Sequence, residues 1–183
     1  MDLKSLLAPF ALKSEELKPF ILKRIILVFL ILFVVIGLDQ GSKHIIRHAL
    51  TNVSQYKYFY NILTVEKVEN TGAFLSLGDT LKEPVKTILM NIIPLLVMIF
   101  GLAFVLLAKN IDKANTYGIA LVIGGGLGNL YDRMLYSSVT DFLFLKLGFL
   151  QTGVFNIADM AIMAGMFTIL IHSYVKDKRA KQG

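Results

Sequence analysis

A run of 22 residues without a charged side chain, residues 87–108, most constrains what this sequence can fold into. At 1.5 Å per residue, a helix of this length measures about 33 Å, which is enough to cross the hydrocarbon core of a bilayer. Pro94 lies within the run and can kink such a helix, because proline lacks the N–H that a helix interior uses. The run therefore predicts a membrane-spanning helix.

Three further apolar segments have the same character. Residues 25–38 are uncharged and reach about 20 residues when their ends are added, which is a spanning length. A third uncharged run ends at Tyr131, and a fourth segment covers residues 156–174. We therefore expect an α-helical integral membrane protein with four transmembrane helices.

Two of these segments admit another interpretation. The basic start before residues 25–38 resembles a secretory signal, but no small-x-small cleavage site follows it and further spans come after it, so we expect the segment to be retained. In the third span, Gly124 and Gly128 match the small-xxx-small pattern of helix packing. They do not match a phosphate-binding loop, because the G-x-G-x-x-G order is absent.

The composition agrees with one membrane domain. Hydrophobic residues make up 55% of the 183 residues and charged residues only 17%, and the mean hydropathy is +0.64. The net charge of +6 comes from lysines and arginines that flank the apolar runs, which is typical of membrane proteins and argues against nucleic acid as a partner. The absence of cysteine excludes disulfides, thiolate metal sites and a cysteine nucleophile.

The basic residues also predict the orientation of the chain. Residues 1–24, the turn 109–113 and the tail 176–183 are rich in lysine and arginine and lie on the same side of four spans. By the positive-inside rule, both termini are then cytoplasmic. We expect residues 1–24 to be a cytoplasmic extension, either an interfacial helix or a loosely ordered basic tail. Residues 25–175 would form the membrane domain, followed by a basic cytoplasmic tail.

The segment between the first two spans has the pattern of β-strands. In residues 55–76, β-branched and aromatic residues partly alternate with polar residues, and turn-forming residues lie at both ends of this segment. We expect a small extracytoplasmic sheet and loop subdomain within residues 44–84. Tyr56, Tyr58 and Tyr60 would then lie near the lipid headgroups, where tyrosine is favoured. The alternative is a surface hairpin with no role beyond packing.

Three carboxylates, Asp132, Asp141 and Asp159, lie beside these apolar segments, although a charged side chain costs roughly 2.5 kcal/mol or more near the bilayer centre. Asp141 follows the third span and Asp159 opens the fourth, so the chain between them can bring both to one membrane face. An aspartyl hydrolase needs two carboxylates that share one proton: one deprotonates a water and the other protonates the scissile carbonyl. The sequence therefore predicts an aspartyl catalytic pair at the outer face.

Three acidic residues, Asp159, Asp132 and Asp39, also have a simpler interpretation. Asn156 and Asp159 stand three residues apart, as in a capping box at a helix start, and this role is compatible with catalysis. Asp132 is most simply paired with its neighbour Arg133. Asp39 is either an ordinary charge at a helix end or a group that orients the substrate.

Other functional classes fit the sequence less well. His44 and His48 are four residues apart, but Ile45 occupies the position where a zinc protease carries its Glu, so we expect no metal site. The G-x-S-x-G and H-E-x-x-H motifs are absent. A small proton-coupled membrane transporter is the remaining alternative, although transporters usually have midplane carboxylates and internal repeats.

Five short blocks of the sequence resemble the lipoprotein signal peptidases, the bacterial signal peptidase II family of membrane aspartyl proteases. They keep the family's order relative to the four spans and are Asp39-Gln40-x-Ser42-Lys43, Asn70-Thr71-Gly72-Ala73, Gly128-Asn129-Leu130-Tyr131-Asp132-Arg133, Val139-Thr140-Asp141-Phe142 and Phe155-Asn156-Ile157-Ala158-Asp159. The family usually continues the second block as Ala-Ala-Phe-Ser, whereas this chain has Ala73-Phe74-Leu75-Ser76, so the loop that covers the substrate is expected to differ in shape.

The resemblance implies roles for these residues. It assigns the catalytic pair to Asp141 and Asp159. The residues that it implies bind the substrate or support the site are Asp39, Lys43, Asn70, Gly72, Asn129, Asp132, Arg133, Asn156 and Ala158. It implies no metal and no cofactor.

The resemblance also implies the reaction. The expected enzyme is an aspartyl endopeptidase that removes the signal peptide from diacylglyceryl-modified prolipoproteins and cleaves before the lipidated cysteine, at the outer surface of the bacterial cytoplasmic (inner) membrane. Its partners would be the prolipoprotein substrates and membrane lipid, and it would act as a monomer. Anchoring of enzyme and substrate in the same membrane would hold the substrate near the site.

Overall fold

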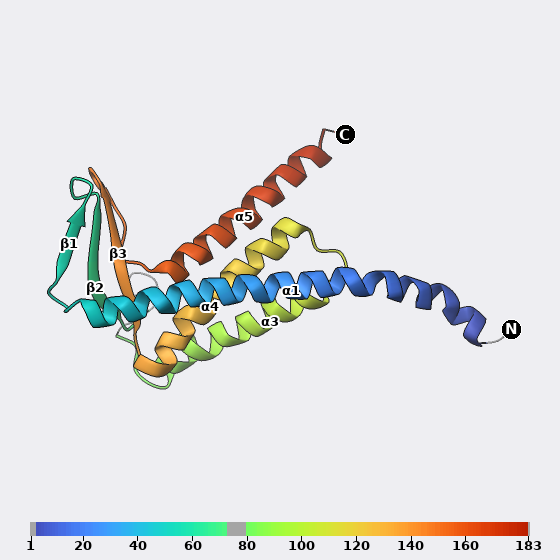
Figure 1. The fold of residues 1–183 in the computed structure, drawn as a ribbon, viewed down its shortest axis with the longest axis horizontal. Helices are drawn as coiled ribbons and strands as arrows, with labels where there is room; N and C mark the ends of the chain where they lie inside the picture. The colour runs from blue at the N-terminus through green and yellow to red at the C-terminus, as the bar shows by residue number, and fades with distance from the viewer. Residues whose placement is uncertain (1–2, 73–79, 183) are drawn as a thin grey trace.

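The computed structural model of the chain describes residues 3–72 and 80–182, with side chains from residue 21 onward. The long helices are α1 (Leu3–Ala49), α3 (Ile93–Leu107), α4 (Lys113–Tyr136) and α5 (Ile157–Ala180). They pack together around α4, a small sheet covers one end of them, and both termini lie toward the opposite end (Figure 1). This arrangement confirms the predicted combination of long helices and a small β-sheet subdomain.

Three helical stretches in the described part of the chain are long and apolar enough to cross a membrane, namely Ile21–Ala49, Val85–Leu107 and Ile157–Ala180. They correspond to the first, second and fourth predicted spans. The third predicted span is α4, which has 24 residues and is not one of these three stretches. Its buried residues include several glycines and the polar residues Thr116, Asn129 and Asp132. Large apolar side chains such as Phe33 and Phe100 are exposed, which suits a surface in contact with lipid.

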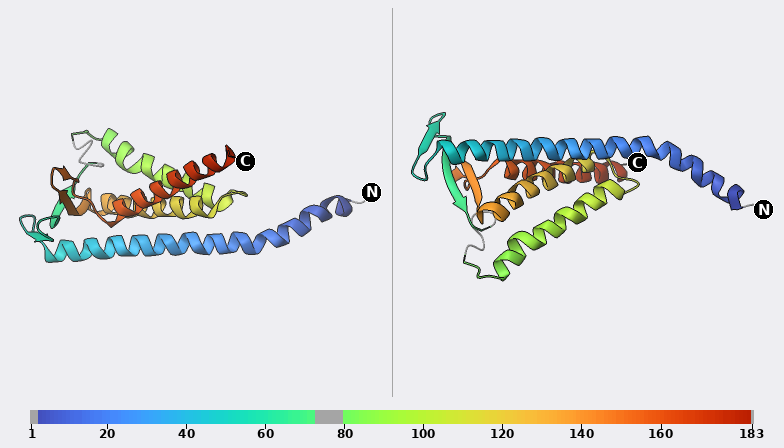
Figure 2. Two further views of the ribbon diagram at one scale, coloured as in Figure 1. Left: turned by 90° about the horizontal axis from the view of Figure 1, so that it is seen from above. Right: turned by 60° about the horizontal axis from the view of Figure 1, so that its bottom comes forward.

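Helix α1 is longer than a membrane requires. Its 47 residues correspond to about 70 Å at 1.5 Å per residue. The N-terminal part extends beyond the other helices and bends away from the axis of the rest of α1 (Figure 2). The helix runs through the predicted boundary at residue 24, and α5 continues past residue 175 to Ala180. The N-terminal extension is thus helical, while the division into extension, membrane domain and tail stays a prediction.

Glycines allow α4 to approach its neighbours closely. A Cβ added at Gly124 would lie 3.0 Å from the nearest side-chain atom of α1, and one at Gly128 would lie 2.6 Å from Asp39 Oδ2. A Cβ at Gly125 would collide with the carbonyl oxygen of Ala158 at the start of α5. This confirms that Gly124 and Gly128 serve helix packing, and it places Asp39 and the start of α5 at the same level of α4.

The second span contains an irregular turn next to its proline. Residues Val85–Thr87 form α2, Ile88–Ile92 form the π-helical turn η2, and α3 begins at Ile93 with Pro94 in its first turn. Proline has no N–H to donate, and its ring displaces the carbonyl four residues earlier. The wider π turn accommodates both effects, so the predicted irregularity at Pro94 takes this form.

The sheet joins two distant parts of the sequence. β1 (Gln55–Tyr58) and β2 (Leu63–Asn70) form the hairpin predicted in residues 55–76. β3 (Val139–Leu147) and β4 (Leu150–Gln151) form a second hairpin, and the antiparallel strand order is β1-β2-β3-β4. The sequence does not predict this second hairpin, because a short apolar run such as that of β3 has no clear strand periodicity.

The chain turns sharply from α4 into β3. Ser137 caps the C-terminus of α4 with a left-handed backbone (φ 58°), and β3 then pairs with β2, with Asp141 opposite Val68. In the first hairpin, Tyr56, Tyr58 and Tyr60 are exposed. Their location at the headgroups stays a prediction.

Candidate active site

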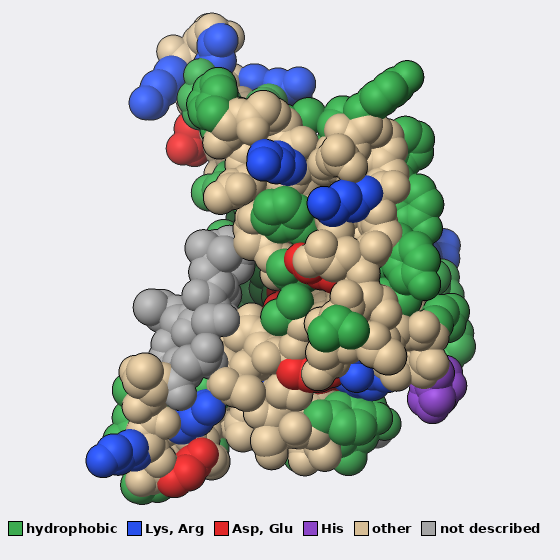
Figure 3. Space-filling view, turned by 90° about the vertical axis from the view of Figure 1, so that its left-hand side faces the viewer, with side chains coloured by type: hydrophobic (Ala, Val, Ile, Leu, Met, Phe, Trp, Pro, Cys, Tyr) green, Lys and Arg blue, Asp and Glu red, His purple; other side chains and the backbone are tan. Residues whose placement is uncertain are grey.

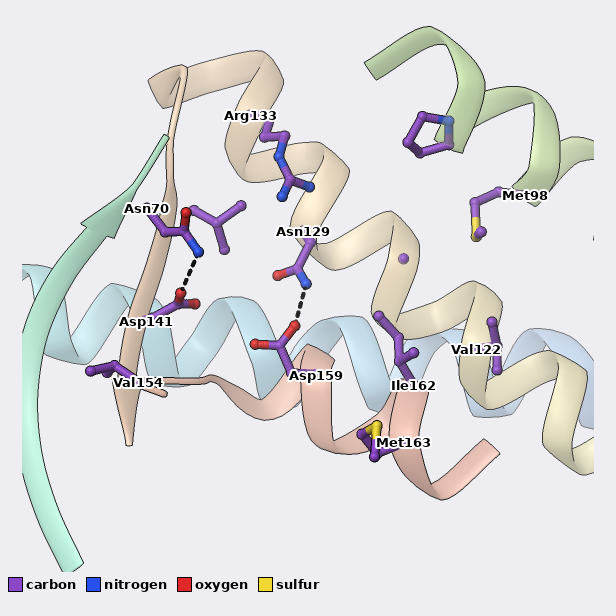
Figure 4. Close-up of a pocket in the computed structure, with 13 residues that line it drawn as sticks. Asn70, Met98, Val122, Asn129, Arg133, Asp141, Val154, Asp159, Ile162 and Met163 are labelled. Carbon is purple, nitrogen blue, oxygen red and sulfur yellow. Dashed lines mark hydrogen bonds between the residues drawn. The ribbon is translucent and has the colours of Figure 1, made fainter. Parts of the chain in front are cut away.

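Asp141 and Asp159 come from different elements and line one pocket. Asp141 is the third residue of β3, and Asp159 is the third residue of α5. The pocket has a volume of about 320 Å³, and Figure 4 shows its lining, with Asn70 beside Asp141 and Asn129 beside Asp159. The remaining lining combines Arg133 with apolar residues and a glycine: Pro94, Met98, Val122, Gly126, Val139, Val154, Ile162 and Met163.

Asp159 is held by the start of α5. The Asn156 N–H donates to Asp159 Oδ2 (3.1 Å), and the Asp159 N–H donates to Asn156 Oδ1 (2.9 Å), so the predicted capping box is present. Asn129 Nδ2 donates a further hydrogen bond to Asp159 Oδ1 (2.8 Å). Asp159 therefore receives one N–H hydrogen bond from the start of its own helix and one from α4.

Asp141 is buried and receives its hydrogen bonds from two amides. Asn156 Nδ2 donates to Asp141 Oδ1 (2.6 Å), and Asn70 Nδ2 donates to Asp141 Oδ2 (3.0 Å). Burial raises the pKa of Asp141 to about 6, with a further contribution from the charge of Asp159, while the Asn70 hydrogen bond opposes the shift. Asp141 is thus able to carry a proton near neutral pH.

One residue links the two carboxylates. Asn156 contacts Asp141 through its side-chain amide and Asp159 through its backbone N–H. Asn156 is fully buried, so its position is fixed. The two predicted catalytic side chains are therefore brought together by the helix cap that the sequence suggested.

A group of four charged residues lies against this pair, and we call Asp39, Lys43, Arg47 and Asp132 the buried ion cluster. Lys43 Nζ contacts Asp39 Oδ2 (2.8 Å) and Asp132 Oδ2 (3.0 Å), and Arg47 Nη2 contacts Asp132 Oδ1 (2.8 Å). The side chains of Asp39, Lys43 and Asp132 have no exposed surface. Two acidic groups are thus balanced by two cations inside the protein.

The buried ion cluster touches the groups that hold Asp159. Lys43 Nζ donates to Asn129 Oδ1 (2.9 Å), which also accepts from Asn156 Nδ2 (3.1 Å), so Asn129 must present its Nδ2 to Asp159. Asp39 Oδ1 accepts from the Ala158 N–H (3.0 Å) in the first turn of α5. The cluster therefore orients the amide of Asn129 and anchors the helix start.

The expected pair between Asp132 and Arg133 is wrong. Asp132 faces Lys43 and Arg47 on α1, while Arg133 Nη2 donates to the Gly72 carbonyl oxygen (2.9 Å). Consecutive residues of an α-helix point about 100° apart, so Asp132 and Arg133 face different neighbours. Arg133 lines the pocket instead and holds the chain after β2.

Gly72 acts through its backbone at the edge of the pocket. Its N–H donates to Asn70 Oδ1 (3.0 Å), which leaves Asn70 Nδ2 directed at Asp141. With the Arg133 contact, both backbone groups of Gly72 are used. The departure from the family pattern at residues 73–76 lies outside the described residues.

Two polar residues of this region, Gln40 and Arg47, were not among the site residues expected from the sequence. Gln40 Nε2 lies within hydrogen-bond distance of Asp39 Oδ2 (3.0 Å), the Gly128 carbonyl oxygen (3.0 Å) and Asp132 Oδ1 (3.1 Å). Arg47 Nε donates to Thr140 Oγ1 (2.8 Å). The sequence contained a signal for Arg47, because Asp39, Lys43 and Arg47 recur every four residues and so share one helix face.

The two histidines lie elsewhere. His44 and His48 are exposed, and the His44 carbonyl oxygen is 2.8 Å from His48 Nδ1. Among the residues that the structure describes, no group of three potential metal ligands is found.

Viewed from the sheet end, acidic atoms are visible in a recess bordered by hydrophobic side chains (Figure 3).

The chain is similar to known proteins over most of its length. Residues 31–175 match the family described as signal peptidase (SPase) II. Two proteins named lipoprotein signal peptidase are similar: one from Borrelia duttonii, 28% identical over 162 residues (85% of this chain, 94% of that protein), and one from Enterococcus faecalis, 30% identical over 161 residues (87% and 94%). A solved bacterial membrane enzyme superposes with a TM-score of 0.73 at 26% identity, covering 84% of this chain and 90% of that chain. These matches give no support to a transporter.

Proposed function

The chain belongs to the signal peptidase II family of membrane aspartic peptidases, and we propose that it cleaves prolipoproteins with Asp141 and Asp159 as the catalytic pair. The observation that carries this proposal is the pocket in which Asn156 links the two carboxylates. Two carboxylates in one pocket can share a proton, as acid and base catalysis on a peptide bond requires.

The surroundings of the two aspartates support different roles. Asp159 accepts two N–H hydrogen bonds at a helix start and lines the pocket, so we assign it as the base that deprotonates the attacking water. Asp141 has its pKa raised to about 6 by burial, so it would carry the proton that is donated toward the scissile carbonyl. The titration belongs to the pair, because the two groups interact.

The rest of the pocket fits a lipid-modified peptide. Apolar side chains such as Met98, Ile162 and Met163 continue from the carboxylates along the helices, where acyl chains held in the bilayer would approach. We infer that the substrate is a diacylglyceryl-modified prolipoprotein and that cleavage occurs before the lipidated cysteine. In this scheme, one chain supplies both proton transfers, so no metal, organic cofactor or second subunit is required.

The orientation in the membrane follows from charge. The two termini lie toward the end opposite to the sheet (Figure 1), where Lys109, Lys113 and the tail 176–183 are found. We infer that this end is cytoplasmic and that the site faces outward. Because the chain has no cysteine, single cysteines at Tyr60 and Lys181 provide a test. In intact spheroplasts, a membrane-impermeant thiol reagent should label the first and not the second.

The main test is cleavage of a purified diacylglyceryl-modified prolipoprotein in detergent. Wild-type protein should release the signal peptide, and mass spectrometry should find the lipidated cysteine at the new N-terminus. Asp141→Asn and Asp159→Asn should each abolish cleavage while the thermal unfolding midpoint is retained. Asp112→Asn, which makes the same chemical change at an exposed carboxylate at the other end of the bundle, is the matched control and should cleave normally.

Different results would reject different parts of the proposal. Wild-type rates in either dyad variant would exclude that aspartate from catalysis. Cleavage at another bond would reject the inferred position relative to the cysteine. Equal cleavage of a precursor that lacks the diacylglyceryl group would reject the inferred lipid requirement.

A further inference from the structure

Thr140, the residue before Asp141 on β3, is fully buried beside the catalytic pocket. Val139 and Asp141 line the pocket, and among the described residues Thr140 is not part of that lining. This alternation is expected, because consecutive side chains of a strand point to opposite faces. Thr140 therefore points away from a substrate held in the pocket, and any influence it has on the reaction must act through its neighbour Asp141.

The Thr140 hydroxyl group joins two charged side chains from different elements. Arg47 Nε of α1 donates to Thr140 Oγ1 (2.8 Å), and Thr140 Oγ1 donates to Glu69 of β2, at 3.0 Å from Oε1 and 3.2 Å from Oε2. Glu69 Oε2 also accepts from Ser138 Oγ (2.7 Å), just before β3. A hydroxyl group has one proton to donate, so its two partners fix its direction, and hydrogen bonds to ionised groups are roughly twice as strong as neutral ones.

Further contacts hold this link on the side of the helices. Arg47 Nη2 contacts Asp132 Oδ1 (2.8 Å), and the guanidinium carbon of Arg47 lies 4.0 Å from the centre of the Tyr136 ring. The Thr140 N–H donates to Asp132 Oδ2 (3.3 Å). Thr140 is thus fixed to α1 and α4 through both its side chain and its backbone N–H.

The part of β3 that carries Asp141 has a short pairing with β2. A register shift between Val65 and Val68 interrupts the ladder. Within the described residues, the pairs beyond this shift are Val68–Asp141, Glu69–Thr140 and Asn70–Val139. A slip of one residue would turn Asp141 to the opposite face of the sheet. The link opposes such a slip, because Glu69 lies directly opposite Thr140.

We propose that Thr140 is a positioning residue for the reaction: its hydroxyl group holds β3 between Arg47 and Glu69 and thereby keeps Asp141 directed into the catalytic pocket. Catalysis is sensitive to such placement, since a displacement of about 1 Å can lower a rate on the order of 10²-fold. This inference rests on the catalytic role proposed above for Asp141.

The test compares two buried threonines in the cleavage assay. Thr140→Val removes the hydroxyl group and keeps the shape of the side chain, while Thr140→Ser keeps the hydroxyl group. Thr116→Val is the matched control, because Thr116 is also buried and its Oγ1 donates to the Asp112 carbonyl oxygen (3.1 Å) at the other end of α4. Values of kcat and KM are measured with a diacylglyceryl-modified prolipoprotein at a temperature where thermal unfolding shows every variant to be folded.

For T140V, kcat should fall about 10- to 100-fold, because Asp141 is no longer held in place. KM should stay unchanged, since Thr140 does not line the pocket. T140S and T116V should keep the wild-type kcat. The proposal is overturned if T140V and T116V have equal kcat values, if T140S loses as much kcat as T140V, or if T140V changes KM alone.

Glu69→Met tests the same link from its other end if T140V fails to fold. Glu66→Met is its matched control on the same strand, where Glu66 Oε2 accepts from Gln55 Nε2 (2.6 Å) in the first hairpin. E69M should lower kcat without changing KM, though by less than T140V, because the contact between Arg47 and Thr140 remains. Equal kcat values for E69M and E66M would reject the proposal.

D141N, measured in parallel, separates this inference from the proposed function. Wild-type cleavage by D141N would reject the catalytic role of Asp141 and, with it, the positioning role of Thr140. Loss of cleavage in D141N together with a normal kcat in T140V would reject the positioning role alone.

Discussion

The buried ion cluster and the pair Asp141/Asp159 are adjacent carboxylate groups with different partners. In the cluster, Asp39 and Asp132 contact Lys43 and Arg47, and the three groups Asp39, Lys43 and Asp132 are closed off from solvent. The pair instead receives its hydrogen bonds from amides, and both of its side chains line a pocket.

This difference separates two uses of a buried acid. Each carboxylate of the cluster contacts a cation, and the contacts of Lys43 and Arg47 with Asp132 join α1 to α4. Asp141 instead accepts hydrogen bonds from two neutral amides, and burial raises its pKa to about 6. The cluster is therefore suited to hold the helices together, and the pair is suited to proton transfer.

The largest expected effect concerns whether Asp141 and Asp159 act as a unit. Each of D141N and D159N should lower kcat/KM by a factor on the order of 10⁴, and the double variant should be no slower than either single variant, because one missing partner already stops the shared proton transfer. Rates are measured with a diacylglyceryl-modified prolipoprotein. Losses that multiply in the double variant would show that the two carboxylates act independently.

The second prediction breaks the cluster while leaving the pair in place. Lys43→Met leaves Asp39 and Asp132 without their shared cation, and removal of one partner from a buried ion pair costs about 3–5 kcal/mol. We expect a large drop in the thermal unfolding midpoint in detergent, with partial recovery in K43M/D39N.

The exposed pair between Lys176 and Asp112 is the control for this prediction. Lys176→Met makes the same chemical change, but that pair is accessible to solvent, so its loss should change stability by at most about 1 kcal/mol. If K43M and K176M shift the unfolding midpoint equally, the buried ion cluster does not support the fold as described.

The sequence predicts the parts of this architecture that have a strong local pattern. The uncharged run 87–108 and the glycines Gly124 and Gly128 identify helices and their contacts, since length and small-residue spacing are local signals. Asn156 and Asp159 identify a helix cap for the same reason. Recognition of the five blocks then brings together residues that are distant in sequence.

Contacts between elements are harder to predict from the sequence. Asp132 is adjacent to Arg133 in the chain but pairs with Lys43 and Arg47, because helix geometry directs neighbours to different faces. Strand β3 was missed because its pairing with β2 depends on residues about 70 positions away. Such pairings depend on tertiary packing, which no local pattern encodes.

The third prediction tests the amide environment of the pair through pH. If Asp141 donates a proton, kcat should fall as the pH rises through about 6, where this carboxyl loses its proton. The Asn70 hydrogen bond lowers the pKa of Asp141, so Asn70→Leu should move this limb to higher pH, by up to about one unit for a bond to a charged group. The measurement is a pH profile of kcat at saturating substrate. A limb that moves to lower pH would contradict the assigned proton donor.

The smallest effect comes from the outer side of α1, next to the buried ion cluster. A Cβ at Gly41 would meet no atom within 4 Å, whereas one at Gly128 would lie 2.6 Å from Asp39 Oδ2. Gly41→Ala should therefore stabilise the helix by about 0.5–1 kcal/mol and leave cleavage unchanged, because alanine restricts the unfolded chain. Gly128→Ala should lower the unfolding midpoint, because Asp39 must move. If Gly41→Ala slowed cleavage while raising the midpoint, α1 would need flexibility beside the cluster, and the cluster would be more than a rigid support for the catalytic pair.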